Sequence, residues 1–197
     1  MSMLTSISPL GERARGNRWS LTVLWLGLGA VGGGAAIGAA FGALGRASVA
    51  AAGSGARLAL LAVACAAAAV WDLSDRRLPG RRQVNEDWLV AYRSWVYGAG
   101  FGLQLGAAVA TVVNTALVPL FMLAALLAGD MTAGLAIGAA FGATRGASLV
   151  LGRRVRTPDD LRHLHRRLDQ HADRIRQAGA GVAAALGGAA AASLLAL

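Results

Sequence analysis

Long apolar runs constrain the fold of this chain more than any other sequence feature. Five segments are apolar and contain no basic residue over a length that approaches or exceeds one membrane crossing. About 20 such residues form a helix that crosses the hydrocarbon core of a bilayer, which is about 30 Å thick. The sequence therefore predicts an all-α, polytopic integral membrane helix bundle with about five transmembrane helices. The predicted spans are residues 19–45, 58–71, 94–113, 117–144 and 178–197.

The composition agrees with this class and argues against soluble alternatives. Only 15% of the 197 residues are charged and 56% are hydrophobic, whereas a soluble domain carries about 25% charged residues. The net charge of +9 would otherwise suggest nucleic-acid binding, but the apolar runs argue against a nucleic-acid partner. The single cysteine, Cys65, excludes an intrachain disulfide and a thiolate-cluster metal site.

The distribution of positive charge predicts the orientation. All 19 basic residues are arginines, and with the N-terminus inside, only Arg46 and Arg57 fall on the outer side. Short cytoplasmic loops are enriched in positive residues. We therefore expect a multi-pass protein of the cell membrane with a cytoplasmic N-terminus and an external C-terminus.

Two cytoplasmic segments are predicted between the spans. Residues 72–92 contain a Pro-Gly turn signal and are expected to form a solvated loop. Residues 157–177 are expected to form an amphipathic basic helix, with Thr157 as the N-cap and Pro158 at the first helical position. This helix is predicted to lie on the anionic lipid headgroups of the inner leaflet; the alternative is docking on the protein's own cytoplasmic face. The predicted headgroup contacts are Arg162, Arg166, Arg167 and Arg174.

A repeat with an offset of one hundred residues indicates an internal duplication. Residues 36–48 read AIGAAFGALGRAS and residues 136–148 read AIGAAFGATRGAS; the alternative is convergence of a Gly/Ala-rich composition. In the predicted topology the two copies cross the membrane in opposite directions. We therefore predict an inverted repeat, with copies at about 19–73 and 117–197, inside a single membrane domain of residues 1–197.

Inverted repeats build many small transporters, whose sites lie near the midplane and often where helices break. Matching breaks are predicted at residues 32–34 and 129–134; the alternative is a tilted helix with a packing ridge of glycines. Such ridges let helices approach closely in lipid. The predicted packing glycines, spaced four apart, are Gly34, Gly38, Gly42, Gly98, Gly102, Gly106, Gly134, Gly138 and Gly142.

Polar residues inside the apolar segments are the candidate site. Asp130 is the only acidic residue in a predicted span, where a carboxylate costs about 2.5–3.5 kcal/mol. We expect it to form a midplane substrate or ion site with Gln104, near Asn114 at the outer end of the third span. One alternative is that residues 117–128 form a short helix, with Asp130 in an outer or inner loop or as the cap of a helix beginning at Met131. For Gln104 the alternative is an interhelical hydrogen bond.

No constellation typical of an enzyme, metal or cofactor site is present. We find no Walker A, GxSxG or HExxH motif and no paired carboxylates. His163, His165 and His171 lie in the basic segment without a set of metal-ligating partners. The sequence therefore predicts a protein that is not an enzyme and that has no metal site and no cofactor.

The glycine-rich copies at residues 34–45 and 134–142, with the run GAGFGLQLG at residues 98–106, resemble the small-exporter group of membrane proteins. This group includes the LysE-type transporters, the sulfite-exporter-like proteins and the membrane domain of CcdA/DsbD-like cytochrome c biogenesis proteins. The resemblance implies a small exporter built on an inverted repeat. Its thiol-conducting members use a pair of membrane cysteines, which this chain lacks.

Two classes of function follow from the sequence. The first is a small secondary transporter or exporter, with a midplane site near Asp130 and Gln104. The second is a non-catalytic membrane subunit or scaffold that assembles with partner proteins and lipid. In either class the predicted partners are the anionic inner leaflet and a second copy of the chain or another membrane protein.

Overall fold

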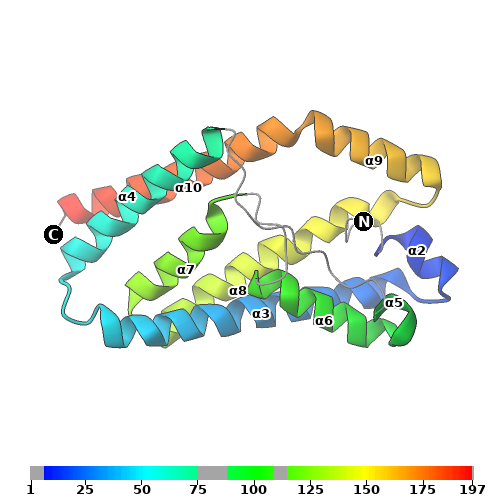
Figure 1. The fold of residues 1–197 in the computed structure, drawn as a ribbon, viewed down its shortest axis with the longest axis horizontal. Helices are drawn as coiled ribbons and strands as arrows, with labels where there is room; N and C mark the ends of the chain where they lie inside the picture. Colours follow the sequence, from blue (N-terminus) through cyan, green and yellow to red (C-terminus); the bar gives the residue numbers. More distant parts are fainter. Residues whose placement is uncertain (1–6, 75–87, 109–114, 197) are drawn as a thin grey trace. The chain divides into compact units, whose positions relative to one another are not determined.

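The computed structural model describes residues 7–74, 88–108 and 115–196, and the protein is all-α (Figure 1). Alanine and leucine, which have high helix propensity, are frequent in its helices. The helices are α2 (Pro9–Ala14), α3 (Trp19–Ser48), α4 (Ser54–Leu73), α5 (Trp88–Ala91), α6 (Ser94–Ala107), α7 (Leu117–Ala128), α8 (Met131–Ala147), the 3-10 helix η1 (Ser148–Arg154), α9 (Pro158–Gln170) and α10 (Ala172–Leu195).

Within the described part of the chain, four helices are long and apolar enough to cross a membrane: α3, α4, α8 continued by η1, and α10. Three of them correspond to the first, second and fifth predicted spans. The third and fourth predicted spans differ from the structure. Helix α6 ends at Ala107 after 14 residues, so at 1.5 Å per residue it is shorter than the hydrocarbon core.

The fourth predicted span, residues 117–144, is corrected to two helices. Helix α7 ends at Ala128, and the next residue, Gly129, adopts the left-handed conformation with φ 62°. Glycine pays no Cβ penalty there, and its N–H donates to the carbonyl of Leu126 at 3.1 Å. Helix α8 then begins at Met131. The break predicted within residues 129–134 is therefore present.

The break predicted at residues 32–34 is absent, because α3 runs as one helix of 30 residues from Trp19 to Ser48. Glycine weakens a helix in isolation, but Gly33 is buried against a neighbouring helix. A methyl group placed on it would lie 3.0 Å from the Cα of Leu103 in α6. Close packing of this kind holds a glycine-rich segment in helical form in lipid.

The residue contacts divide the chain into two compact units. The division falls inside α3 and inside α8, so each unit has part of both helices. The first unit comprises residues 1–35, 81–112 and 139–171, and the second comprises residues 36–80, 113–138 and 172–197.

In the first unit, α6 lies parallel to the first half of α3. Gly98 of α6 lies near Thr22 of α3, and Gly106 lies near Ala30. Aromatic and aliphatic side chains from α3, α5, α6, η1 and the residues just before α2 form its core. The buried members are Ile7, Leu26, Leu89, Tyr97, Phe101 and Leu149.

In the second unit, α4 and α10 pack side by side in opposite directions (Figure 1). Gly187 of α10 lies against Cys65 of α4, and Gly55 at the start of α4 lies against Leu194 near the end of α10. Helix α7 packs on α4. The buried members of this core are Cys65, Ala68, Ala116, Leu120 and Ala183.

The predicted cytoplasmic segments are only partly as expected. The segment 157–177 is two helices, because α9 ends at Gln170 and α10 begins at Ala172. Arg174 consequently lies on α10. In the segment 72–92, Asp72 belongs to α4 and residues 88–91 form α5, while 75–87 lie outside the described residues.

Candidate functional site

Asp130 is exposed and caps the N-terminus of α8. Its Oδ1 accepts the backbone N–H of Ala133 at 2.8 Å and a short hydrogen bond from the Thr132 hydroxyl. A side-chain oxygen in this position satisfies a helix N–H that has no partner within the helix. The capping alternative considered for Asp130 is therefore the observed arrangement.

Asp130 lies beside the C-terminal part of α3. Its carbonyl lies against Gly42, which is six residues before the end of α3. Asp130 therefore lies near one end of that long helix, because the predicted span in which it was central is divided at Gly129. Binding of a substrate or ion at Asp130 stays a prediction.

The other two residues of the predicted midplane site are Gln104 and Asn114. Gln104 is half-buried on α6 in the first unit, whereas Asp130 belongs to the second. Asn114 lies outside the described residues. A polar site shared by the three residues thus stays a prediction.

The glycines proposed for packing lie where backbones meet. A methyl group on Gly38 of α3 would overlap the carbonyl oxygen of Gly134 in α8 and would lie 2.9 Å from the Cα of Gly138. In the first unit, a methyl group on Gly102 of α6 would overlap the carbonyl oxygen of Leu26. Only glycine allows such an approach, which also brings Cα–H groups to carbonyl oxygens. All nine glycines of the predicted set are buried.

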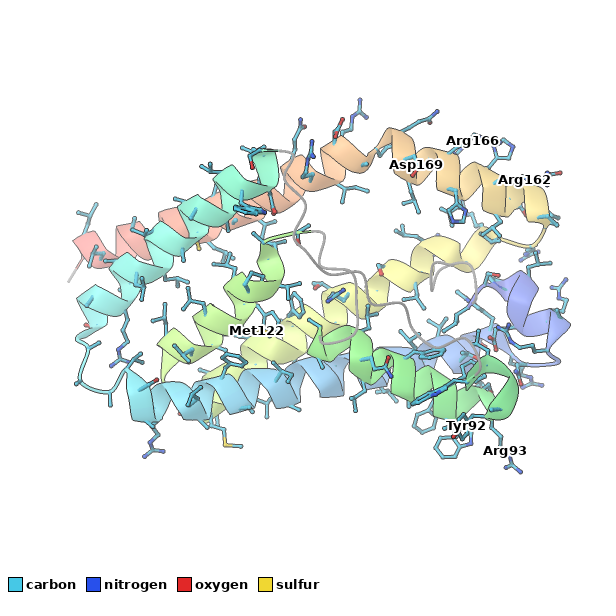
Figure 2. All side chains as sticks on the ribbon, in the orientation of Figure 1. Tyr92, Arg93, Met122, Arg162, Arg166 and Asp169 are labelled. Carbon is cyan, nitrogen blue, oxygen red and sulfur yellow. The ribbon has the colours of Figure 1, made fainter. Side chains whose placement is uncertain are left out.

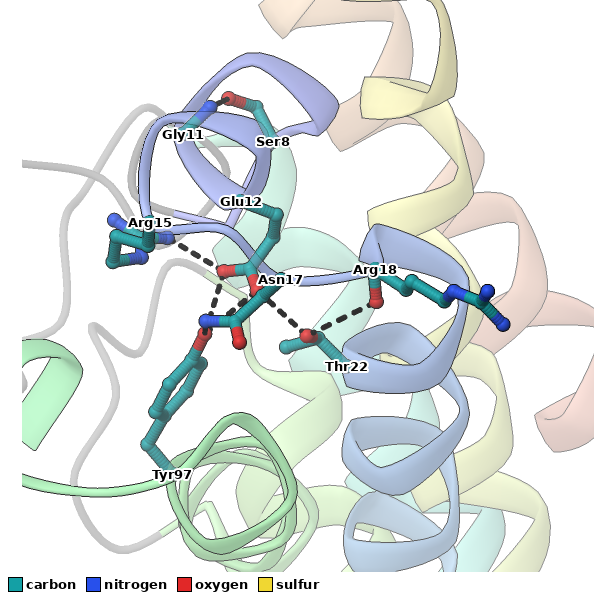
Figure 3. A network of polar contacts seen from close by, with 8 residues as sticks. All are labelled: Ser8, Gly11, Glu12, Arg15, Asn17, Arg18, Thr22 and Tyr97. Carbon is teal, nitrogen blue, oxygen red and sulfur yellow. Dashed lines mark hydrogen bonds and ion pairs between the residues drawn. The ribbon is translucent and has the colours of Figure 1, made fainter.

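A buried acidic cluster that sequence reasoning missed lies in the first unit (Figure 3). The Glu12 side chain on α2 is fully buried. Its oxygens accept hydrogen bonds from the Tyr97 hydroxyl at 2.6 and 2.8 Å and from the Thr22 hydroxyl at 2.7 Å. Arg15 forms an ion pair with it at 2.6 Å, and the Asn17 amide donates to the Tyr97 oxygen at 3.2 Å.

This cluster fixes α2 to α3 and α6. A buried carboxylate is tolerated when it is paired and its remaining lone pairs accept hydrogen bonds, and Glu12 meets both conditions. Because these partners all belong to the protein, the arrangement is typical of a structural contact that holds helices together. The one signal in the sequence is a lone glutamate among the arginines before the first span, and its partner Tyr97 could not be predicted because it lies 85 residues away.

A second buried carboxylate, Asp72, lies at the end of α4 in the second unit. The residue is 3% exposed. Its Oδ1 accepts the backbone N–H of Ala116, the N-cap residue of α7, at 2.7 Å. Its Oδ2 is buried and has no hydrogen-bond partner among the described residues. The sequence assigned Asp72 to a solvated loop, which is corrected here: two further elements, α7 and α10, cover it.

Helix α9 carries three arginines and three aspartates. Thr157 and Asp160 form a reciprocal capping box, and Pro158 occupies the first turn. Backbone N–H groups of Arg156 and Thr157 donate to the Asp160 carboxylate and, with the Thr157 side chain, hold the pKa of Asp160 below its usual range. Thr157 is therefore the N-cap residue of α9, as predicted, and the capping box satisfies N–H groups of the first turn.

The exposure of α9 is that of an amphipathic surface helix. None of its residues is buried, and Arg162, Arg166 and Arg167 are exposed. Figure 2 shows the side chains of Arg162 and Arg166 on this helix. Leu161, Leu164 and Leu168 are half-buried.

Among the described residues, no group of three or more His, Cys, Asp or Glu side chains lies close enough to hold a metal ion. Cys65 is a free, buried thiol packed against α10. Comparison with protein-family models, with curated proteins and with solved structures finds no match. The resemblance to the small-exporter group therefore stays an expectation drawn from sequence motifs.

Proposed function

We propose that this multi-pass protein is a non-enzymatic membrane subunit or scaffold that is held on the anionic inner leaflet by α9. The observation that carries the proposal is the position of α9. It connects one candidate span, which ends at Arg154, to the next, which begins at Ala172. A helix joined to a span at each end is held close to the membrane, and Arg162, Arg166 and Arg167 on it are exposed.

Electrostatics favours anionic lipid as the partner of this surface. Each basic residue near an anionic leaflet contributes about 1 kcal/mol. Arg162 is already paired with Asp159 at 3.0 Å, so the exposed Arg166 and Arg167 would contribute about 2 kcal/mol together, which corresponds to about 30-fold in affinity. Half-buried leucines on the same helix provide the apolar side that an interfacial helix requires.

Charge-removing and charge-preserving variants of α9 test this proposal. The protein is reconstituted in nanodiscs that contain phosphatidylglycerol and phosphatidylcholine, and native mass spectrometry measures the phosphatidylglycerol that it retains. Changing Arg162, Arg166 and Arg167 to glutamine should reduce the retained phosphatidylglycerol strongly. The matched change of all three to lysine should largely preserve it. Equal retention by both variants would refute the lipid role.

Transport is a second candidate function, and two observations favour it. The repeat copies lie on α3 and α8, which contact each other in opposite directions, with Gly38 near Gly134 and Gly42 near Asp130. The fourth predicted span is divided into two helices at Gly129, and in many transporters the site lies at such discontinuous helices. In a transporter of this kind Asp130→Asn should abolish complementation of a strain that lacks the protein. In a scaffold, in which Asp130 is a helix cap, the same variant should complement fully.

The proposed orientation keeps the N-terminus inside and the C-terminus outside. It requires one crossing beyond the four candidate helices, and among the described residues the short helices α6 and α7 are the segments that would supply it. In a Cys65→Ala background, single cysteines at Arg46, Arg57 and Leu195 are labelled from each side of the membrane. Labelling of Arg46→Cys or Arg57→Cys only from the cytoplasm would refute this orientation.

The predicted protein partner is a second copy of the chain or another membrane protein. Cross-linking of the full chain in its native membrane, followed by mass measurement of the product, separates these two cases. A cross-linked mass of two chains supports the homodimer. Absence of any cross-linked product from either partner would argue against the scaffold.

A further inference from the structure

The span that contains α8 ends in an unusual helix, the 3-10 helix η1. A 3-10 helix has three residues per turn and poorer hydrogen-bond geometry than an α-helix, so runs longer than three or four residues are uncommon. In η1 the run is seven residues long. Leu149, Gly152 and Val155 are buried, whereas the residues between them are exposed. The buried face therefore recurs every three positions, which is the period of a 3-10 helix.

The same period sorts the exposed side chains into two rows. Side chains three positions apart are eclipsed in a 3-10 helix, so Val150 lies in line with Arg153, and Leu151 lies in line with Arg154. At about 2.0 Å per residue, the two members of a row are separated by about 6 Å along the axis. In an α-helix of 3.6 residues per turn, they would be rotated apart by about 60°. Each row thus consists of an apolar residue followed by an arginine.

The two kinds of residue lie at different depths in the span. Val150 is 42% exposed and Leu151 is 58% exposed, and both lie before the end of the candidate span at Arg154. Arg153 and Arg154 are exposed at that end. Exposed apolar residues inside a span face acyl chains, while arginines at its end lie at the level of the headgroups. The rows therefore match the two parts of a phospholipid.

The arginines of η1 carry positive charge that no nearby acid neutralises. Among the described residues, neither Arg153 nor Arg154 forms an ion pair. The acids that follow in the chain are engaged elsewhere, since Asp159 pairs with Arg162 at 3.0 Å and Asp160 accepts backbone N–H groups in the capping box. In α9, by contrast, three arginines are matched by three aspartates. The charge of η1 is therefore free to attract an anion.

The chemistry of the two rows selects the ligand. A guanidinium group donates parallel hydrogen bonds to the oxygens of a phosphate. We infer that η1 binds an anionic phospholipid, with its phosphate on Arg153 and Arg154 and its acyl chains along Val150 and Leu151. The assignment rests on the proposed location of this end of the span at the inner leaflet, and it adds a second lipid contact to that of α9. A free phosphate would leave the apolar residues of both rows uncovered.

Binding of phosphatidylglycerol to the full chain in detergent micelles, measured by native mass spectrometry, tests this site. The double variant Arg153→Gln/Arg154→Gln should weaken binding by about fivefold for each arginine. The matched control Arg18→Gln/Arg93→Gln removes the same charge from exposed residues of the same unit and should change binding little. Equal weakening by the two pairs would overturn the proposal, because it would indicate diffuse attraction and no defined site.

The α9 variant Arg166→Gln/Arg167→Gln separates this site from the proposed function. Weakening in the α9 variant without weakening in the η1 variant would overturn the site on η1 and leave the role of α9 standing. Weakening in the η1 variant alone would support the site and refute the role of α9, and weakening in both would support both contacts.

A headgroup without acyl chains distinguishes a lipid from a free phosphate. Glycerophosphoglycerol is the headgroup of phosphatidylglycerol alone, so it cannot cover Val150 and Leu151. We expect it not to displace phosphatidylglycerol from the unchanged protein. Displacement at equal concentration would overturn the assignment to a lipid.

Discussion

The contact between α3 and α8 predicts that Gly38→Ala and Gly32→Ala differ in their free energy of unfolding. Both glycines lie on α3. A methyl group on Gly38 would lie 2.9 Å from the Cα of Gly138, whereas one on Gly32 would have nothing within 4 Å. Alanine favours helix over glycine by about 1 kcal/mol at either position. The propensity gain is therefore common to the two variants, and their difference isolates the packing.

The magnitude follows from the geometry. An ordinary van der Waals contact begins at 3.4 Å, so the Gly138 contact must lengthen by about 0.5 Å, and relief of the overlap with the carbonyl of Gly134 requires more. Backbone atoms cannot rotate away as a flexible side chain does. Overpacking of this kind costs about 1–3 kcal/mol, so Gly38→Ala should be less stable than Gly32→Ala by about that amount.

Reversible unfolding in mixed detergent micelles measures this difference. The free energy of unfolding of each variant is compared with that of the unchanged protein, with the helix content followed by circular dichroism. Equal free energies for Gly38→Ala and Gly32→Ala would refute the close approach of α3 and α8, and with it the role assigned to the glycines.

Three further predictions concern polar groups. Tyr97→Phe removes a donor to the buried Glu12 carboxylate and should lower the free energy of unfolding by about 1.5–3 kcal/mol. An unchanged value would contradict the structural role of the Glu12 cluster. Asp130→Ala should cost about 1 kcal/mol and Asp130→Asn much less, because asparagine also caps helices; equal losses in the same unfolding assay would contradict the cap. Because its pKa is lowered in the folded protein, Asp160 stabilises the first turn of α9 above its unfolded pKa of about 3.9. This contribution is lost as the pH falls through the folded pKa, and hydrogen exchange should show the loss in the unchanged protein but not in Asp160→Asn.

The membrane class and much of the helix pattern could be predicted because they depend on local chemistry. Long apolar runs without charge predict spanning helices wherever they occur, and Thr157 and Pro158 begin α9 as their residue types indicate. The prediction was wrong for residues 32–34, because a glycine in a helical segment is compatible with either a break or a continuous helix. Glycines occur at residues 32–34 and at residue 129, yet of these four only Gly129 adopts the left-handed conformation that ends a helix.

Sequence alone determined the apolar segments, the arginines of α9 and the spacing of the packing glycines, since each is a property of consecutive residues. Tertiary structure decided which acidic groups are buried. Asp130 lies in an apolar run and is exposed, because the chain turns there and its carboxylate caps α8. Glu12 and Asp72 lie in polar stretches and are buried, because their hydrogen-bond partners come from residues 85 and 44 positions away. Burial depends on distant elements, and no local pattern encodes it.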